Sequence, residues 1–143
     1  MDKLKIKLAE TSEELKQILD IRKIVFIEEQ KVPKEVEIDE YEKEATYFIA
    51  YLKSEPVGCA RIRYKDFAKL ERIAVVKKYR KQGIGTKITN YLIDYCHKKN
   101  IYDIHINSQL YVVDFYEKIG FKKVGEIFYE AGIKHVEMIL QGS

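Results

Sequence analysis

Apolar and polar residues alternate along the chain in a pattern that predicts seven strands and three helices. Period-two alternation is typical of a half-buried strand, and apolar residues recurring every 3.6 positions are typical of an amphipathic helix. The predicted strands are Lys3–Leu8, Tyr47–Leu52, Val57–Tyr64, Leu70–Val76, Asp103–Asn107, Phe121–Phe128 and Lys134–Leu140. The predicted helices are 11–28, 84–100 and Val112–Ile119. This order favours an α+β class, with helices flanking a single mixed, mostly antiparallel sheet.

The ends of the first predicted helix carry local signals. Thr11 and Glu14 have the spacing of a capping box, in which the hydroxyl accepts a backbone N–H and the carboxylate reaches back. Pro33 ends the helical pattern, because the residue before a proline disfavours the helical region. An acidic, irregular segment is therefore expected between Pro33 and Tyr47.

Length and composition narrow the class of protein. A chain of 143 residues is the size of one domain, expected over 1–143, and its 46% hydrophobic residues exclude a disordered chain. No apolar run approaches the roughly 18–20 residues that span a bilayer. The segment Met1–Lys7 lacks the continuous apolar stretch of a signal peptide. We therefore expect a cytoplasmic globular protein without a membrane partner.

Cysteine and histidine content argues against a metal centre. Cys59 and Cys96 are too few for a disulfide scaffold or a zinc cluster, and both are expected to be buried apolar residues. The three histidines are scattered and lack the spacing of metal ligands. No metal cofactor is expected.

Charge is distributed unevenly, although the net charge is only +3. The segment Glu28–Glu44 has eight acidic residues and three lysines, a net of −5. The segment Arg61–Lys87 has ten basic and two acidic residues, a net of +8. Such segments indicate either solvated surface or two faces that bind a cation and an anion respectively.

A basic, glycine-containing loop, Arg80–Thr86, precedes the second predicted helix. A helix N-terminus has unpaired N–H groups and partial positive charge, and glycines allow close backbone approach. Together with basic residues these features favour pyrophosphate binding, the alternative being a glycine-rich helix start on a basic surface. A P-loop is excluded by the missing first glycine. A dinucleotide fingerprint is excluded because Ile88 occupies the third glycine position.

The remaining pattern, [RQ]-x-x-G-x-[GA], resembles the coenzyme A loop of the GNAT superfamily of N-acyltransferases. Phe115–Phe121 resembles a second signature of that superfamily, F-Y-x-K-x-G-F, and the resemblance covers about residues 3–140. Further segments resemble the stand-alone bacterial YjcF/ElaA-type subgroup; they are Val25–Pro33, Glu37–Asp39, Lys69–Ile73 and Ala131–His135. Tyr47 departs from the subgroup, which usually has a histidine there.

The resemblance implies a sheet of about seven strands that splays between the fourth and fifth, with acetyl-CoA entering the gap. It implies that the backbone of Ile73 and Val75 pairs with the pantetheine arm, and that the Val75 N–H stabilises the oxyanion. The residues expected to bind the cofactor are Ile73, Ala74, Val75, Arg80, Lys81, Gln82, Gly83, Ile84, Gly85, Thr86, Asn107, Phe115 and Tyr116. Asn107 has an alternative role as a strand-end or helix-capping residue.

Acyl transfer needs a proton donor for the thiolate and a neutral amine. The resemblance makes Tyr116 the general acid, with packing against the sheet as the alternative. Glu71 is the candidate base, with ion pairing to neighbouring arginines as the alternative. Glu28 and Glu29 are expected near the acceptor, where the acidic segment would attract a cationic amine.

The function expected on these grounds is acetyl transfer from acetyl-CoA to a small cationic primary amine by direct attack in a ternary complex. The alternative is a non-catalytic acyl-CoA-binding or sensing module on the same fold. A nucleic-acid-binding domain is disfavoured, because the bases cluster around a glycine loop and the acidic segment would repel phosphates. Dimers are common in the superfamily, so a homodimer is a further expectation.

Overall fold

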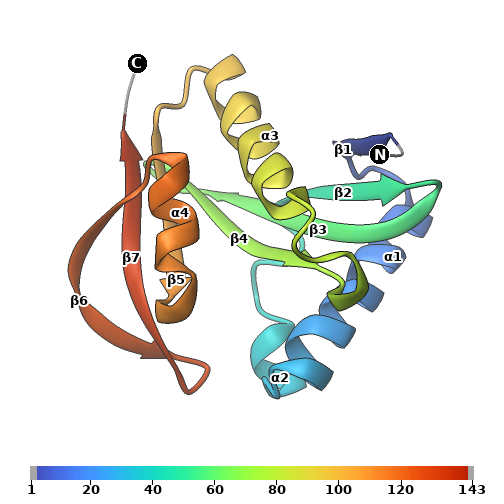
Figure 1. Ribbon diagram of the computed structural model, residues 1–143, viewed down its shortest axis with the longest axis horizontal. Helices are drawn as coiled ribbons and strands as arrows, with labels where there is room; N and C mark the ends of the chain where they lie inside the picture. The colour runs from blue at the N-terminus through green and yellow to red at the C-terminus, as the bar shows by residue number, and fades with distance from the viewer. Residues whose placement is uncertain (1–2, 142–143) are drawn as a thin grey trace.

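The computed structural model describes residues 3–141, which contain one sheet of seven strands (Figure 1). The strands are β1 (Leu4–Leu8), β2 (Thr46–Leu52), β3 (Glu55–Tyr64), β4 (Ala68–Val75), β5 (Asp103–Gln109), β6 (Lys122–Glu130) and β7 (Ile133–Gln141). Their order is β1-β2-β3-β4-β5-β7-β6. Only the β4–β5 pair of this described sheet is parallel, which confirms the predicted mixed, mostly antiparallel sheet. The chain ends 1–2 and 142–143, parts of the predicted domain and N-terminal segment, lie outside the described residues.

Helices cover both faces of the sheet. They are α1 (Ser12–Arg22), the π-helical η1 (Lys23–Glu29), α2 (Lys34–Glu37), the 3₁₀ turn η2 (Lys77–Tyr79), α3 (Ile84–Lys98), the 3₁₀ turn η3 (Leu110–Val112) and α4 (Val113–Ile119). In Figure 1, α3 and α4 stand in front of the strands and α1 passes behind them. Successive residues of β2 face opposite cores, because Phe48 packs with Ile88 of α3 whereas Ile49 packs with Ile18 of α1.

The start of α1 has the predicted capping box. The Thr11 hydroxyl accepts the N–H of Glu14 at 3.1 Å, and the Glu14 carboxylate accepts the N–H of Thr11 at 3.1 Å. The hydrogen bond from the Lys7 ammonium, followed by those from backbone N–H groups, lowers the pKa of Glu14 to about 2. The first helix is thus tied to β1 at its N-terminus.

The acidic segment is more ordered than the sequence predicted. Pro33 is the N-cap residue of the short helix α2, with φ −59° and ψ 140°. Turns from Glu40 to Glu44 then lead to β2. The segment lies against the α1 side of the sheet, since its carboxylates bind arginines of α1, β3 and β4.

The parallel ladder between β4 and β5 is short. It pairs Ala68–Leu70 with Ile104–Ile106, whereas β4 continues to Val75 and β5 to Gln109. The two strands then diverge, β4 toward β3 and β5 toward β7 (Figure 1). The splay expected between the fourth and fifth strands is therefore present.

A bulge in β4 changes which face its residues present. The register passes from Arg61 opposite Glu71 to Cys59 opposite Ala74, so β4 has one extra residue. Arg72 occupies the bulge with φ 55°, the left-handed region. Leu70 and Ile73 consequently pack on the α3 side, whereas Ala74 packs on the α1 side.

Candidate active site

A cavity of about 400 Å³ lies where β4 and β5 diverge. Its walls come from β4, β5, α4, the η1–α2 region and the β6–β7 turn. Lining residues discussed below are Glu37, Arg63, Glu71, Arg72, Ile73, Asn107 and Tyr116. The sheet thus opens into a space large enough for a small molecule next to a cofactor arm.

Backbone groups at the end of β4 face the splay. The N–H of Val76 donates to the carbonyl of Val57 at 2.9 Å, which makes this a hydrogen-bonded pair of the β3–β4 ladder. Since such pairs alternate along an antiparallel ladder, the N–H of Val75 points away from β3. Ile73 lies within the register shift of this ladder, between Glu71 and Ala74. Ile73 and Val75 are the two residues whose backbone was expected to bind pantetheine, and Ala74 between them is buried against α1.

The glycine loop begins α3 with an open N-terminus. Gly83 is the N-cap residue with φ 81°, has no side-chain cap, and has no heavy atom within 4 Å of its ideal Cβ position. The first N–H groups of α3 are therefore accessible to an anion. A Cβ on Gly85 would lie 3.4 Å from the Phe115 ring, so the loop packs against α4. This geometry fits a pyrophosphate.

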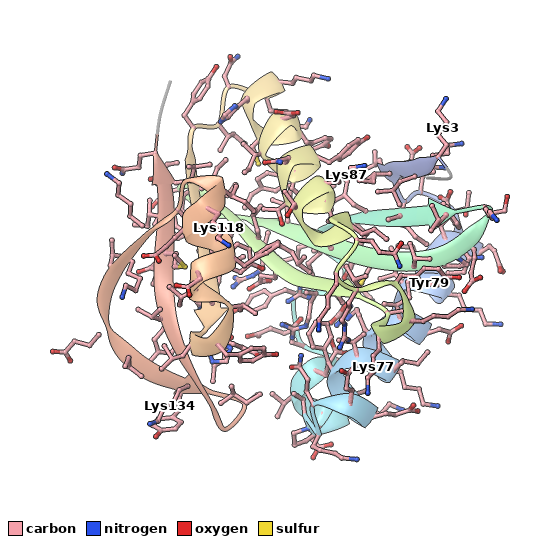
Figure 2. The ribbon with its side chains drawn as sticks, in the orientation of Figure 1. Lys3, Lys77, Tyr79, Lys87, Lys118 and Lys134 are labelled. Carbon is pink, nitrogen blue, oxygen red and sulfur yellow. The ribbon has the colours of Figure 1, made fainter. Side chains whose placement is uncertain are left out.

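Basic residues flank this loop in the sequence. Lys77 comes from η2, together with Tyr79, and Lys87 comes from α3 (Figure 2). Lys81 and Gln82 are exposed in the loop, whereas Ile84, the first residue of α3, is buried in the core. Thr86 is half-buried in the first turn.

Arg80 and Glu29 bind each other. The Arg80 guanidinium donates to both Glu29 carboxylate oxygens at 2.5 and 2.6 Å, and its Nε donates to the Val75 carbonyl at 2.8 Å. The hydrogen bond from Arg80 lowers the pKa of Glu29. From the sequence, Arg80 was expected to bind the cofactor and Glu29 to lie near the acceptor amine. In the structure, the two side chains bind each other. Glu28 is exposed, and neither glutamate lines the cavity.

Tyr116 lies in the cavity wall with its ring in the core. Its ring meets Phe115 and Phe121 edge-to-face at centroid distances of 5.0 and 5.8 Å. Burial, followed by the charge of Tyr111, raises the pKa of Tyr116 well above its ordinary value. The hydroxyl is therefore protonated at neutral pH, as a proton donor must be. Both roles considered for Tyr116, packing and proton donation, fit this position.

Glu71 is held by arginines. Its carboxylate accepts from Arg61 Nε at 3.0 Å and from Arg63 Nη2 at 3.1 Å. Burial alone would raise the pKa of Glu71, but the hydrogen bond from Arg63 and the charges of Arg61 and Lys69 outweigh it and lower the pKa. A carboxylate with a lowered pKa is a weaker base. Of the two roles considered for Glu71, ion pairing is the one that these contacts support.

The acidic and basic segments pair with each other. Arg61 binds Asp39 at 2.6 Å and Glu42 at 3.2 Å. Arg22 of α1 binds Glu42 at 2.7 Å. The expectation that the acidic segment presents a free negative rim is therefore wrong for Asp39 and Glu42, because guanidinium groups neutralise them. The pKa of Glu42 is lowered: hydrogen bonds from Arg22, Asp39 N–H and Tyr47 outweigh the effect of burial.

The remaining residues singled out from the sequence are Asn107, Tyr47 and the two cysteines. Asn107 lines the cavity and donates from Nδ2 to Glu130 Oε1 at 3.3 Å. Tyr47 donates its hydroxyl to Glu42 at 2.7 Å, so it supports the ion-pair cluster. Cys59 and Cys96 are buried, as expected.

Glu37 lines the cavity but is not among the site residues expected from the sequence. The sequence marked it only as one acid of the segment Glu28–Glu44 and, by resemblance, as part of Glu37–Asp39. In the sequence, the only indication was that Glu37 is an acidic residue four positions after Pro33. Its contact with Arg72 of β4 becomes visible only in the folded structure.

Within residues 3–141, no three or more His, Cys, Asp and Glu side chains are grouped so as to hold a metal ion. No helix in this range has the length and apolar character needed to cross a membrane.

These features are those of an acetyltransferase fold, and the comparisons agree. Residues 10–141 match the acetyltransferase (GNAT) domain family, so the chain belongs to that family. The uncharacterised N-acetyltransferase YjcF of Bacillus subtilis (strain 168) is 38% identical over 138 residues, which cover 95% of this chain and 99% of YjcF.

Solved structures show the same fold. Escherichia coli ElaA has a TM-score of 0.85 and 22% identity, covering 99% of this chain and 100% of that chain. A Bacillus subtilis acetyltransferase, solved in complex with CoA, has a TM-score of 0.74 and 21% identity, covering 99% of this chain and 100% of that chain. The predicted membership of the GNAT superfamily and its YjcF/ElaA-type subgroup is confirmed.

Proposed function

We propose that the protein is an acetyl-CoA-dependent N-acetyltransferase that acts on a primary amine in a ternary complex. The observation that carries this proposal is the cavity at the β4–β5 divergence, which has Ile73 of β4 and Tyr116 of α4 in its wall. Family membership and a neighbour that binds CoA support the same conclusion.

The open N-terminus of α3 holds the pyrophosphate in this proposal. Backbone N–H groups from Gly83 to Thr86 donate to it, and nearby lysines add positive charge. Ile73 and Val75 pair with the pantetheine amides, and Asn107 reaches the same arm from β5. Phe115 packs beneath the loop.

Tyr116 completes the chemistry. The amine nitrogen bonds to the thioester carbon, the Val75 N–H stabilises the oxyanion, and the carbon–sulfur bond breaks. Tyr116 gives its hydroxyl proton to the departing sulfur and is reprotonated by the proton that the attacking nitrogen loses. A bound ammonium first loses its extra proton to water. Glu71 stays ion-paired and positions Arg63 at the cavity wall.

The test is thiol release from acetyl-CoA in the presence of a library of primary amines, with CoA affinity measured by calorimetry on the same protein. Thiol release that depends on an amine, with the acetylated amine seen by mass spectrometry, is expected. CoA binding without release for any amine would instead indicate a non-catalytic acyl-CoA-binding module.

A further inference from the structure

His135 of β7 is held in one tautomer at the wall of the cavity. Its ring Nδ1 lies 2.7 Å from the backbone carbonyl of Ile133. A carbonyl oxygen can only accept a hydrogen bond, so Nδ1 carries the proton, and the lone pair of the neutral ring is on Nε2. The Phe128 ring lies nearly parallel to the imidazole, at a centroid distance of 5.9 Å. The ring orientation is thus set by the backbone and by a neighbouring strand.

The lone pair of Nε2 is free to accept a proton. Within residues 3–141, Nε2 makes no hydrogen bond, and Glu37 Oε1 is the only buried side-chain nitrogen or oxygen that lacks a partner. Nε2 is therefore in contact with solvent, although His135 as a whole is only 6% exposed. Glu130 Oε2 lies 3.9 Å from Nε2, and both residues line the cavity. The free nitrogen thus opens toward the cavity.

His135 and Tyr116 approach this cavity from opposite faces of the sheet. His135 is opposite Gln109 in the β5–β7 ladder, so the two side chains share a face, and Gln109 donates to Gln30 at the end of η1. The next residue, Val136, packs in the other core, with Tyr116. The sheet therefore has a proton donor on one side of the cavity and a proton acceptor on the other.

The carboxylates of the cavity wall are poorer bases than this imidazole. Glu37, Asp39 and Glu71 accept hydrogen bonds from arginines, which stabilise their charged form. The Glu130 side chain is about half exposed, and a solvated carboxylate is a weaker base than an imidazole. An imidazole gains and loses its proton near neutral pH, as an efficient general base must.

The groups around His135 favour its protonated form at one point. The titratable groups that face it from the packed elements are Glu130 of β6, Glu137 of β7, His105 of β5 and Tyr111 of η3. Glu137 lies 2.9 Å from His105, which leaves Glu130 as the carboxylate beside Nε2. The cations across the cavity are each paired with a carboxylate; they are Arg63, Lys69 and Arg72.

We propose that His135 is the general base for the acceptor amine. This inference rests on the proposed acetyl transfer and names the group that finally takes the extra proton of the bound ammonium. One N–H bond of the ammonium breaks, the proton passes through a water to Nε2, and the nitrogen keeps the electron pair with which it attacks the thioester. The imidazolium, stabilised by Glu130, then releases the proton to solvent. The acceptor therefore binds as the ammonium ion, the form that dominates for aliphatic amines at neutral pH.

The first experiment compares His135→Asn with His105→Asn. An asparagine amide can donate to the Ile133 carbonyl in place of Nδ1 but cannot act as a base, whereas His105 contacts Asp103 and Glu137 outside the cavity lining. kcat/KM is measured from pH 6 to pH 9 with the library amine that the wild type acetylates fastest. We expect His135→Asn to lower kcat/KM about 100-fold at pH 7, and this loss to shrink about tenfold per pH unit as more of the amine is already neutral. His105→Asn should stay within about threefold of wild type throughout.

The pH dependence separates a base from a structural residue. A loss that is equal at every pH, or an unchanged acidic limb in His135→Asn, would overturn the inference. Wild-type thiol release combined with either result removes the role of His135 and leaves acetyl transfer standing. A wild-type protein that releases no thiol with any amine overturns both proposals.

A second measurement needs no variant and no acceptor. Long-range proton–nitrogen NMR correlations on the wild-type protein distinguish the tautomers of its three histidines. We expect the neutral ring of His135 to carry its proton on Nδ1. A proton on Nε2 contradicts the inference, because the nitrogen that faces the cavity could then accept none, and this outcome is decisive even where His135→Asn fails to fold.

Discussion

Tyr116 combines a core position with a place in the cavity wall. Its ring packs between Phe115 and Phe121, while the residue lines the cavity. Burial raises the pKa of the hydroxyl, which keeps it protonated at neutral pH and also makes it a weaker acid than a free tyrosine. The sequence offered packing or proton donation as alternatives, and this position is compatible with both.

Replacement of Tyr116 by phenylalanine keeps the ring and removes the proton. We expect Tyr116→Phe to lower kcat by about 100-fold, within the range of general acid catalysis, with a CoA Kd within about threefold of wild type. Stopped-flow thiol release and calorimetry measure the two quantities. Tyr129→Phe, at a 68% exposed tyrosine on β6, is the control. Wild-type kcat in Tyr116→Phe would exclude the acid role.

Glu71 illustrates the opposite outcome. Its lowered pKa and its contacts with Arg61 and Arg63 indicate a structural carboxylate. We expect Glu71→Gln to keep the acidic limb of the kcat/KM profile and to lower the free energy of unfolding by about 2–4 kcal/mol, because a buried guanidinium loses its partner. Urea denaturation and a pH–rate profile check the two parts. Loss of the acidic limb in a folded variant would restore Glu71 as the base.

Residue positions were predictable where they depend on local sequence. The loop glycines and Tyr116 lie in short signatures, because a helix N-terminus and one helical turn are local structures. The place of Glu37 in the cavity wall was not predictable, because it depends on contacts with Arg22 of α1 and Arg72 of β4. Its partners are 15 and 35 residues away in the sequence.

At the scale of elements, the end of η1 is joined to the cofactor loop. Glu29 and Arg80 form a bidentate pair across 51 positions of sequence, and Arg80 also donates to the Val75 carbonyl. The pair links the η1–α2 wall of the cavity to the start of α3. In the proposed cofactor site, a phosphate and the Glu29 carboxylate would therefore compete for the Arg80 guanidinium.

Removal of that carboxylate tests the competition. We expect Glu29→Gln to tighten CoA binding about two- to fivefold, corresponding to the roughly 0.2–1 kcal/mol of an exposed ion pair, with a smaller effect at high salt. Glu28→Gln, at the preceding exposed position, is the control. Weaker CoA binding by Glu29→Gln would show instead that the pair orders the loop for binding.

At the scale of the whole molecule, opposite charges organise one side of the sheet. The net charge of +3 conceals segments of −5 and +8, and carboxylates of the first bind arginines of the second. Periodicity and turn signals predicted the element order, since those are local. The charge pattern alone did not show whether the two segments face ligands or each other, because that depends on long-range packing.

Low pH should destabilise the folded protein, because the carboxylates of these ion pairs become protonated. The pKa values of Glu14, Glu42 and Glu71 are lowered in the folded state. A group with a lowered folded pKa contributes stability above its unfolded pKa, near 4.5 here, and loses it as pH falls through the folded pKa. We expect the unfolding free energy to fall steadily from about pH 5 toward pH 2. Urea titrations over this range measure it, and a flat profile contradicts the prediction.

The divergence of β4 and β5 has a consequence for solvent exchange within the sheet. A strand edge that faces a cavity leaves its amide protons open to water, although it lies in the middle of seven strands. The amide of Val75 should therefore exchange with deuterium faster than that of Ala74, which faces β3 in the ladder. Beyond the three residue pairs that join β4 to β5, the sheet is open at its centre, and the pantetheine arm of the proposed cofactor would lie there as an added strand.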